Sequence, residues 1–352
     1  MYKMDYFTIA MLAVGIVPAL LIARRNPLAG FAGLIMASVG IPLVAIVLTR
    51  SGSFAMVRLV AWGVFAGFPI GALAVAYIAR EKQRSVAAVS LTAALITFGI
   101  YGFAFHIEPN RLEVNHHEIE SPRITERLRI VLLADIQTDD VGDYEQRVMD
   151  AVREAQPDLV LFAGDYLQCT TQAQLEEQKP LFRRLLNDPA LQTRYGAHAI
   201  PGNCEYGWDW TPLFDDTPVI AHNNTESVDI GPLVLTCLAF QDGRLLTRIP
   251  RADERFHIVL GHYPDFAIGE SNVDADLLLA GHCHGGQVRV PFLGPPIKLS
   301  KIPRSWTEGM TELDGGGKLI VSRGIGMERG AAPRLRFNCR PEIVVIDLVP
   351  AR

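Results

Sequence analysis

The stretch LRIVLLADIQTDDVGDYEQRVMDAVREAQPDLVLFAGD, residues 128–165, decides how the second part of this chain folds. It begins with the apolar run Leu128–Ala134, continues with polar residues in a helical pattern over Tyr144–Gln156, and ends with the apolar run Leu159–Gly164. Apolar runs of this length, bounded by polar turns, are typical of buried strands. The stretch therefore predicts a strand, a helix and a second strand.

The same alternation continues with a helical pattern over Gln172–Leu186 and a short apolar run over Ala197–Pro201. Later apolar runs are mostly strand-like, and Gly- and Pro-rich segments connect them. They are Leu233–Ala239, His257–Leu260, Asp276–Ala280, Lys318–Ser322 and Ile343–Leu348. Together these runs predict an α/β domain over residues 128–352, a mixed β-sandwich flanked by helices.

The first 107 residues have a different character, because four stretches there reach the length of about 20 apolar residues that crosses a bilayer core. They are Tyr6–Ala23, Ala29–Thr49, Phe54–Ala79 and Val86–Phe105. The second and fourth contain no charged residue, which a partly exposed helix of a soluble domain would have. We therefore expect a four-helix transmembrane anchor over residues 1–107, then a polar linker over 108–127.

Basic residues in the short loops predict the orientation of this anchor. The first and third loops carry five, Arg24, Arg25, Arg80, Lys82 and Arg84, against three on the other face, Lys3, Arg50 and Arg111. This bias places the two loops in the cytoplasm and, with an even number of spans, the catalytic domain outside. The predicted location is the inner (plasma) membrane, multi-pass, with an extracytoplasmic catalytic domain.

Charge and composition exclude several classes of function. The chain of 352 residues has a formal charge of −5, and no Lys/Arg cluster appears beyond residue 110, which argues against nucleic acid as a partner. The spans contain no acidic residue or histidine of the kind that marks an ion path, and their one charge, Arg58, lies near a span end. An anchor fits better than a transporter.

Polar residues follow the predicted strands of the second part, where ligands of open α/β sheets collect. The strings are Ala134-Asp135-Ile136-Gln137, Gly164-Asp165-Tyr166, Gly202-Asn203-Cys204-Glu205, Gly261-His262-Tyr263-Pro264 and Gly281-His282-Cys283-His284-Gly285-Gly286-Gln287. Each string alone is more often turn chemistry or a hydrogen-bonded side chain than a ligand. Five such strings in order, the last with two histidines, indicate a metal site.

The donors in these strings are carboxylates, an amide and imidazoles, which suit Mn²⁺, Fe²⁺ or Zn²⁺ rather than Ca²⁺ or Cu(I). Two divalent ions about 4 Å apart can clamp a phosphate and lower the pKa of a bridging water, which then attacks as hydroxide. A carboxylate between the ions reduces their repulsion. We assign that role to Asp165.

At this point the chain resembles the calcineurin-like metallophosphoesterases, and within them a membrane-associated bacterial branch. The resemblance covers about Leu128–Leu348 and rests on the five strings above, on Arg323-Gly324-Ile325-Gly326 and on the closing Arg336–Glu342 segment. It implies a first ion held by Asp135, Asp165 and His284. It implies a second ion held by Asp165, Asn203, His262 and His282.

Two positions depart from the family pattern. Gln137 stands where the family usually has a histidine ligand, and its neutral amide oxygen shifts the first site towards harder ions, Mn²⁺ above all. Cys204 stands where the family has the histidine that contacts the phosphate and protonates the leaving group. A thiol is a weak proton donor and carries no positive charge. The alternative for Cys204 is a disulfide, for instance with Cys169.

The sequence therefore predicts a metal-dependent hydrolase of phosphodiester or pyrophosphate bonds, with Asp165 and Cys204 in the catalytic machinery. Its substrate would be a phosphorylated small molecule or a lipid-linked one, met at the bilayer. If the domain is cytoplasmic, the resemblance points instead to a UDP-diacylglucosamine pyrophosphatase. The losses at positions 137 and 204 leave a third reading open, a degenerate sensor that binds metal or phosphate without hydrolysis.

Overall fold

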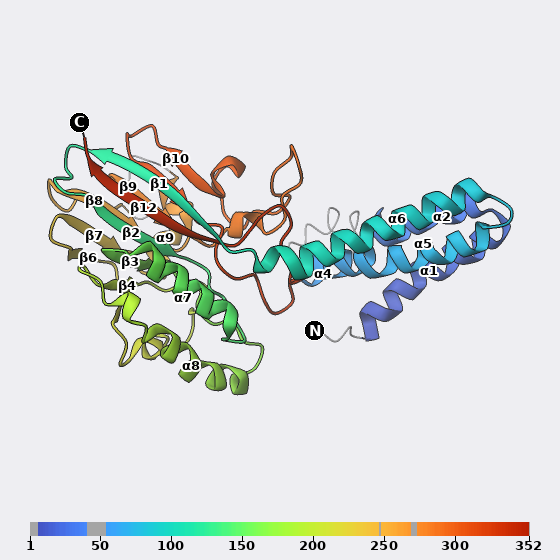
Figure 1. Ribbon diagram of the computed structural model, residues 1–352, viewed down its shortest axis with the longest axis horizontal. Helices are drawn as coiled ribbons and strands as arrows, with labels where there is room; N and C mark the ends of the chain where they lie inside the picture. Colours follow the sequence, from blue (N-terminus) through green and yellow to red (C-terminus); the bar gives the residue numbers. More distant parts are fainter. Residues whose placement is uncertain (1–5, 41–53, 246–247, 269–272, 352) are drawn as a thin grey trace. The chain divides into compact units, whose positions relative to one another are not determined.

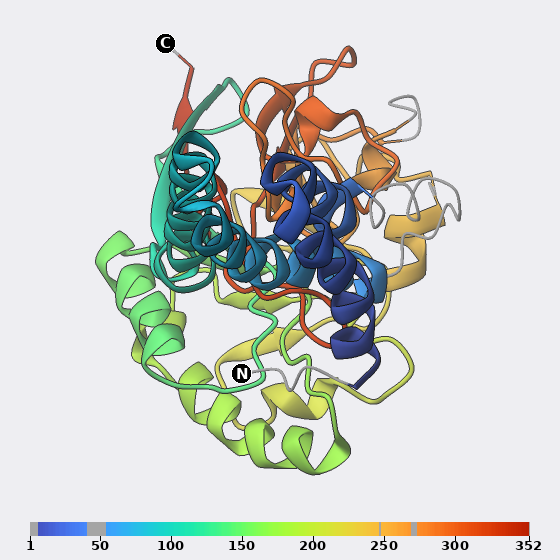
Figure 2. The ribbon, with the colours of Figure 1, turned by 90° about the vertical axis from the view of Figure 1, so that its right-hand side faces the viewer.

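The computed structural model describes residues 6–40, 54–245, 248–268 and 273–351. It divides into two compact units, Met1–His106 with Ala331–Arg334, and Ile107–Gly330 with Leu335–Arg352. Figures 1 and 2 show the helices of the first unit in blue to blue-green and the chain of the second from green to red.

The first unit is helical. Its elements are α1 (Tyr6–Arg25), α2 (Pro27–Ile35), η1 (Met36–Gly40), α4 (Phe54–Trp62), η2 (Gly63–Gly67), α5 (Phe68–Ala79), α6 (Arg84–Gly102) and η3 (Phe103–Ile107). Within the described residues, two continuous helices are long and apolar enough to cross a membrane, Phe54–Ala79 and Arg84–Asn110. The expected second span reaches into residues 41–53, outside the described part, and Pro27–Gly40 alone is a shorter apolar helix. The four-span topology thus stays a prediction.

Alanines make up most of the interior of this helical unit, together with Leu34 and Val75, whereas many large apolar side chains face outwards. The buried cluster includes Ala19, Ala23, Ala72 and Ala94, each at most 3% exposed. Gly30 packs so closely on Ala23 that an added Cβ would lie 2.3 Å from the alanine methyl carbon. Close backbone approach through small residues is the usual packing of helices in membranes.

The second unit contains two six-stranded sheets. The first has the order β1 (Glu113–Ser121), β12 (Glu342–Pro350), β2 (Leu128–Leu133), β3 (Leu159–Phe162), β4 (Ala197–Ala199) and β5 (Val219–Ala221). The second has the order β10 (Gly309–Glu312), β11 (Lys318–Val321), β9 (Leu277–Ala280), β8 (Phe256–Leu260), β7 (Leu233–Cys237) and β6 (Glu226–Asp229). Strands β2 to β5 are parallel, as are β7, β8, β9 and β11.

Alternation along the strands explains why the two sheets stack. On β2, Ile130 and Leu132 face the second sheet, where they join Leu235 and Ile258 in one core. Val131 and its neighbour Leu133 face the other way, into a core with the helices α7 (Asp143–Ala155) and α8 (Gln172–Leu186). Figure 1 shows both helices along the outer face of the first sheet. The predicted mixed sandwich of two sheets is confirmed.

The outer face of the second sheet has less helical cover. A third core there gathers Val259, Leu278 and Leu319 beneath Phe266, which belongs to the turn η7 (Pro264–Ala267). The remaining helix is short, α9 (Phe240–Leu245), and the other 3-10 turns are η4 (Glu108–Asn110), η5 (Pro189–Leu191), η6 (Thr211–Phe214), η9 (His284–Gly286) and η10 (Arg304–Trp306).

The segment expected to be a linker, residues 108–127, instead contributes a strand to the first sheet. β1 pairs in parallel with β12 from Glu113 opposite Glu342 to Ser121 opposite Pro350. Its sequence, EVNHHEIES, is polar because an edge strand can leave most of its side chains in solvent, and only two of its nine residues are buried. A pattern of hydrophobic periodicity does not detect such a strand.

A chain of hydrogen bonds through two buried histidines links β4 and the end of β5 in the first sheet to β6 in the second. His198 of β4 contacts His222 through their Nδ1 and Nε2 atoms at 2.9 Å, and His222 Nδ1 lies 2.8 Å from a carboxylate oxygen of Glu226. His198 is 2% exposed, and its burial, together with the neighbouring His222 ring, lowers its pKa to about 4.

This lowered pKa predicts a loss of stability in acid. Between pH 6.5 and 4 the unfolded chain gains a proton at His198 while the folded chain does not, so acidification favours unfolding by at most about 3 kcal/mol from this group. In His198→Gln that contribution is absent. Thermal unfolding of the full chain at pH 7 and pH 4.5 should therefore show a smaller fall in Tm for the variant, and equal falls would contradict the assignment.

Candidate metal centre

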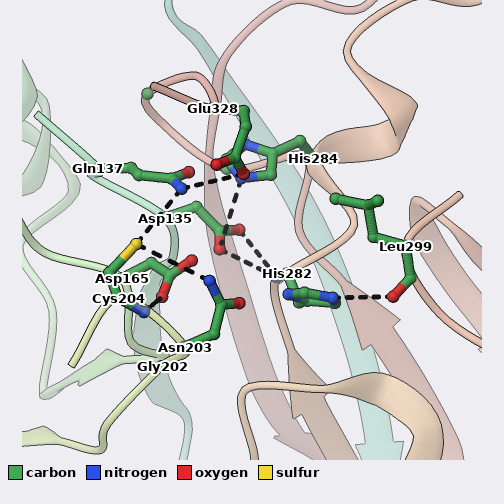
Figure 3. Close-up of polar contacts among 12 residues, drawn as sticks. Asp135, Gln137, Asp165, Gly202, Asn203, Cys204, His282, His284, Leu299 and Glu328 are labelled. Atoms are coloured by element: carbon green, nitrogen blue, oxygen red, sulfur yellow. Dashed lines mark hydrogen bonds and ion pairs between the residues drawn. The ribbon is translucent and has the colours of Figure 1, made fainter. Parts of the chain in front are cut away.

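Five of the predicted site residues meet at one edge of the sandwich. Asp135 and Asp165 follow the parallel strands β2 and β3, while His262 and His282 follow β8 and β9, and His284 lies one turn further. All five are buried, with exposures between 0% and 7%. Figure 3 shows most of them converging, with Gln137 and Cys204 beside them. The carboxyl ends of the two stacked sheets bring these residues together.

The backbone at this edge is strained. Among the described residues, ten other than glycine have positive φ, and five of these are predicted ligands, Asp135, Gln137, Asp165, His282 and His284. A left-handed conformation costs a residue with a side chain on the order of 1–2 kcal/mol. Glycines leave room beside them: an added Cβ at Gly202 would lie 2.3 Å from Asp165 Oδ1, and one at Gly281 would lie 2.8 Å from Asp135 Oδ2.

Two groups of side chains could each hold a divalent ion, and they share Asp165. One group is Asp135, Asp165 and His284, and the other is Asp165, His262 and His282. Within each group the candidate ligand atoms all lie within 4.8 Å of one another. His262 Nε2 is 3.5 Å from Asp165 Oδ2, and His284 Nε2 is 4.0 Å from Asp135 Oδ1. Asn203 adds an amide oxygen 3.1 Å from His262 Nε2.

Backbone carbonyls fix which nitrogen two of the histidines present. His262 donates from Nδ1 to the carbonyl of Ala163 (2.7 Å), so Nε2 faces the site. His282 donates from Nε2 to the carbonyl of Leu299 (2.9 Å), so Nδ1 is the nitrogen that can bind an ion. Burial lowers the pKa of His262 to about 4 and that of His282 to about 3, so both rings are neutral at pH 7, as metal ligands must be.

The two aspartates place negative charge in a buried position. Asp135 accepts two bonds from the His282 N–H at 3.0 Å, and Asp165 Oδ1 accepts one from the Cys204 N–H at 2.7 Å. Burial raises the pKa of Asp135 well above its usual range and that of Asp165 to about 7. Within the described part of the chain, the ion pairs that these two carboxylates form are with histidines only. A bound cation would supply the missing counter-charge.

Gln137 presents an unsatisfied oxygen. Its amide nitrogen donates to Glu328 Oε2 and Gln168 Oε1, both at 3.2 Å, and lies 3.5 Å from Cys204 Sγ. Its Oε1 is buried and, like Nδ1 of His284, has no hydrogen-bond partner. Buried polar atoms are almost always paired, so an orphaned acceptor beside two carboxylates fits a metal ligand.

Sequence reasoning missed Glu328 and Gln168. Glu328 is 8% exposed and accepts from Gln168 Nε2 at 2.7 Å as well as from Gln137. The segment just before Glu328 is held by Arg336. This side chain is fully buried, and its guanidinium donates to the carbonyls of Arg323, Gly324 and Gly326. A lone Glu in a loop carries no sequence signal of this role.

Glu205 and Cys204 also take definite places. Glu205 is buried and accepts from the N–H groups of Asp165, Tyr166 and Gly202 at 2.8–2.9 Å, so it ties two site loops together. Cys204 is a free thiol, as is Cys169, so the suggested disulfide between them is not present. Burial and the nearby Asp165 carboxylate hold the pKa of the Cys204 thiol well above its usual range.

Arg323 and Arg329, two arginines near the site, have protein partners. Arg323 forms ion pairs with Glu113 (2.7 Å) and Glu342 (2.8 Å). Arg329 donates from Nε to the carbonyl of Gln137 at 2.8 Å and lies 3.5 Å from Asp139. Both side chains support the site loops.

Comparisons with known proteins agree with this geometry. The family model for calcineurin-like phosphoesterases matches residues 128–286. Metallophosphoesterase YkuE of Bacillus subtilis is 31% identical over 286 residues, covering 76% of this chain and 96% of that protein. Phosphodiesterase YaeI of Escherichia coli is 27% identical over 284 residues, covering 76% and 99%.

A more distant relative is a transmembrane protein with a metallophosphoesterase domain from Danio rerio, 25% identical over 232 residues, covering 58% of this chain and 51% of that protein. The match to YkuE, over nearly all of that protein, together with the match of the family model, decides the family. This chain belongs to the calcineurin-like metallophosphoesterases, and it is a phosphoesterase enzyme.

Proposed function

We propose that this protein hydrolyses phosphodiester or pyrophosphate bonds with two divalent ions, and that it works at a membrane surface. The observation that carries the first part is the sharing of Asp165 between the two buried ligand groups. One carboxylate that belongs to both groups is the arrangement that lets two cations lie close together. Two ions so placed supply Lewis acidity towards the phosphoryl group and the attacking water.

The proposed ligand sets follow from the contacts. Asp135, Asp165 and His284 would hold the first ion with Gln137 Oε1 as a further donor, and Asp165, Asn203, His262 and His282 would hold the second. The first set has more oxygen donors, which favours Mn²⁺ over softer ions. The hydrogen bonds from the Gln137 amide nitrogen to Glu328 and Gln168 fix the plane of the amide and leave its buried Oε1 without a protein partner.

Cys204 shapes the proposed substrate preference. Its N–H binds Asp165 Oδ1, so its side chain lies beside the reacting centre. A thiol there supplies no positive charge to the phosphate, unlike a protonated imidazole. We therefore favour leaving groups that are stable as anions, as in phosphodiesters with good leaving groups and in phosphoanhydrides.

Removing the shared charge tests the site. Asp165→Asn should reduce hydrolysis of bis(4-nitrophenyl) phosphate to below about one hundredth of the wild-type rate, because a neutral amide cannot hold both ions. The circular dichroism spectrum should not change. Asp150→Asn, at a partly exposed position of α7 outside the site, is the matched control and should keep full activity.

Near-full turnover of Asp165→Asn with metal bound would show the assignment to be wrong. Metal binding by the wild type without any turnover would instead favour a non-hydrolytic sensor.

The assignment of ligands to the first ion can be tested by metal binding, without an activity assay. In calorimetric titration with Mn²⁺, Gln137→His should bind more tightly, because imidazole is a stronger donor than an amide oxygen. Gln168→Ala should bind about tenfold more weakly, because the Gln137 amide is then free to turn.

A surface control, Gln146→His on α7, adds an imidazole elsewhere and should leave the affinity unchanged. Unchanged or weaker binding by Gln137→His would count against Gln137 as a ligand.

The membrane location is proposed from the helical unit. Its large apolar side chains are exposed, among them Ile70 (60%), Leu95 (60%) and Ile96 (57%), which water would disfavour and lipid would not. Two helices have the required length and composition. We propose that the expected four spans anchor the enzyme, with a phosphorylated small molecule or a lipid-linked phosphate as substrate.

The basic loops predict which side the catalytic unit faces. An alkaline phosphatase reporter fused after Arg352 should be active and a fluorescent protein at the same place dark, if the domain is extracytoplasmic. The reverse pair of results would place the site in the cytoplasm, where a nucleotide-linked lipid such as UDP-diacylglucosamine becomes the substrate to assay.

A further inference from the structure

A cavity of about 530 Å³ lies next to the metal centre within the catalytic unit. Its walls come from α9, from the turn after β8 and from the segment 298–301. We call it the Arg244 pocket, after the exposed arginine of α9 that lines it. A cavity of this size is in the range of small-ligand sites, about 300–1,000 Å³.

The pocket shares a wall with the candidate ligands. Tyr263, which lines the pocket, has its ring centroid 3.8 Å from that of His282 and 5.4 Å from that of His262. The carbonyl of Leu299, another lining residue, accepts the hydrogen bond from His282 Nε2, as Figure 3 shows. The pocket therefore borders the metal centre, with Tyr263 and Leu299 between it and His282.

The charge of the pocket is positive. Arg244, Lys298 and Lys301 line it, and the lining includes one acidic residue, Asp265. Asp265 is 4% exposed and already accepts hydrogen bonds from the Lys301 N–H and the Ser300 hydroxyl. Lys298 donates to the carbonyls of Lys301 and Ile302, which are neutral groups that hold its ammonium in place without cancelling its charge.

An aromatic side chain fixes the direction of Arg244. Its guanidinium carbon lies 5.9 Å from the centroid of the Tyr263 ring, a distance at which the cation and the ring face attract each other. Tyr263 is thus in contact with a pocket cation on one side and with His282 on the other.

We propose that the Arg244 pocket binds a second phosphoryl group of the substrate, beyond the phosphorus atom that is attacked. This inference rests on the proposed function, since it assigns the pocket to the substrate of the same centre. It narrows the substrate class to compounds with two phosphoryl groups, either bonded as an anhydride or separated by a short linker. Arginine and lysine are the usual partners of phosphate oxygens, and the pocket has room for more than a phosphate alone.

Non-hydrolysable phosphonates test this directly. Alkane-α,ω-bisphosphonates with linkers of increasing length are compared with the alkylphosphonates of equal carbon number, in calorimetric titration of the Mn²⁺-loaded full chain. At least one bisphosphonate should bind more tightly than its monophosphonate counterpart. Arg244→Gln and Lys298→Gln should each weaken that bisphosphonate by about tenfold and leave the monophosphonate unchanged.

Two further variants guard the interpretation. Lys298→Arg keeps the charge and should restore most of the affinity if Lys298→Gln acts through charge rather than through misfolding. Arg147→Gln removes another exposed arginine that stacks on a tyrosine, Tyr144, outside the pocket, and should have no effect.

Equal affinity for mono- and bisphosphonates, or equal losses for both in the variants, would overturn the proposal. Wild-type turnover of bis(4-nitrophenyl) phosphate, measured in parallel, reports on the proposed function alone. Its absence would refute the hydrolase while the titrations still decide the pocket.

Discussion

The site of the catalytic unit depends on two carboxylates, Asp135 and Asp165, that are buried side by side and form no ion pair with a Lys or Arg among the described residues. An isolated buried charge costs far more free energy than a fold of this size can lose. The surrounding chain suits bound cations: neutral imidazoles face the carboxylates, backbone N–H groups bind them, and both aspartates have left-handed backbone.

Gln137 is held in the site in a different way from the histidines. An imidazole has one nitrogen to bind metal and one to bind a carbonyl, as His262 and His282 do here. An amide is oriented by acceptors that bind its N–H groups, and the chain provides the Glu328 carboxylate as such an acceptor from a loop nearly two hundred residues later. The buried Arg336 holds the chain just before Glu328 in place, so the far end of the domain contributes to the site.

The sequence predicts much of this site because ligands at the carboxyl ends of parallel strands are neighbours in space as a matter of geometry. The runs over 128–134, 159–164 and 276–280 contain β2, β3 and β9, and the residues after them do meet. What it does not predict depends on tertiary contacts. β1 is polar on an exposed edge, Glu328 has no local pattern, and which nitrogen His282 presents is decided by the carbonyl of Leu299.

The two units bury different kinds of side chain: the catalytic unit buries large apolar residues, whereas the helical unit buries mainly small ones. In the catalytic unit, large apolar residues such as Phe162 and Phe256 are interior because water drives them there. In the helical unit the interior is mostly alanine with Leu34 and Val75, while Ile70 and Leu95 lie outside, a distribution expected of helices that close packing holds together in lipid. Which side chains a unit buries therefore indicates the medium around it. The outward leucines and isoleucines of the helical unit support a bilayer as its surroundings. The inward aspartates of the catalytic unit indicate that cations complete its site.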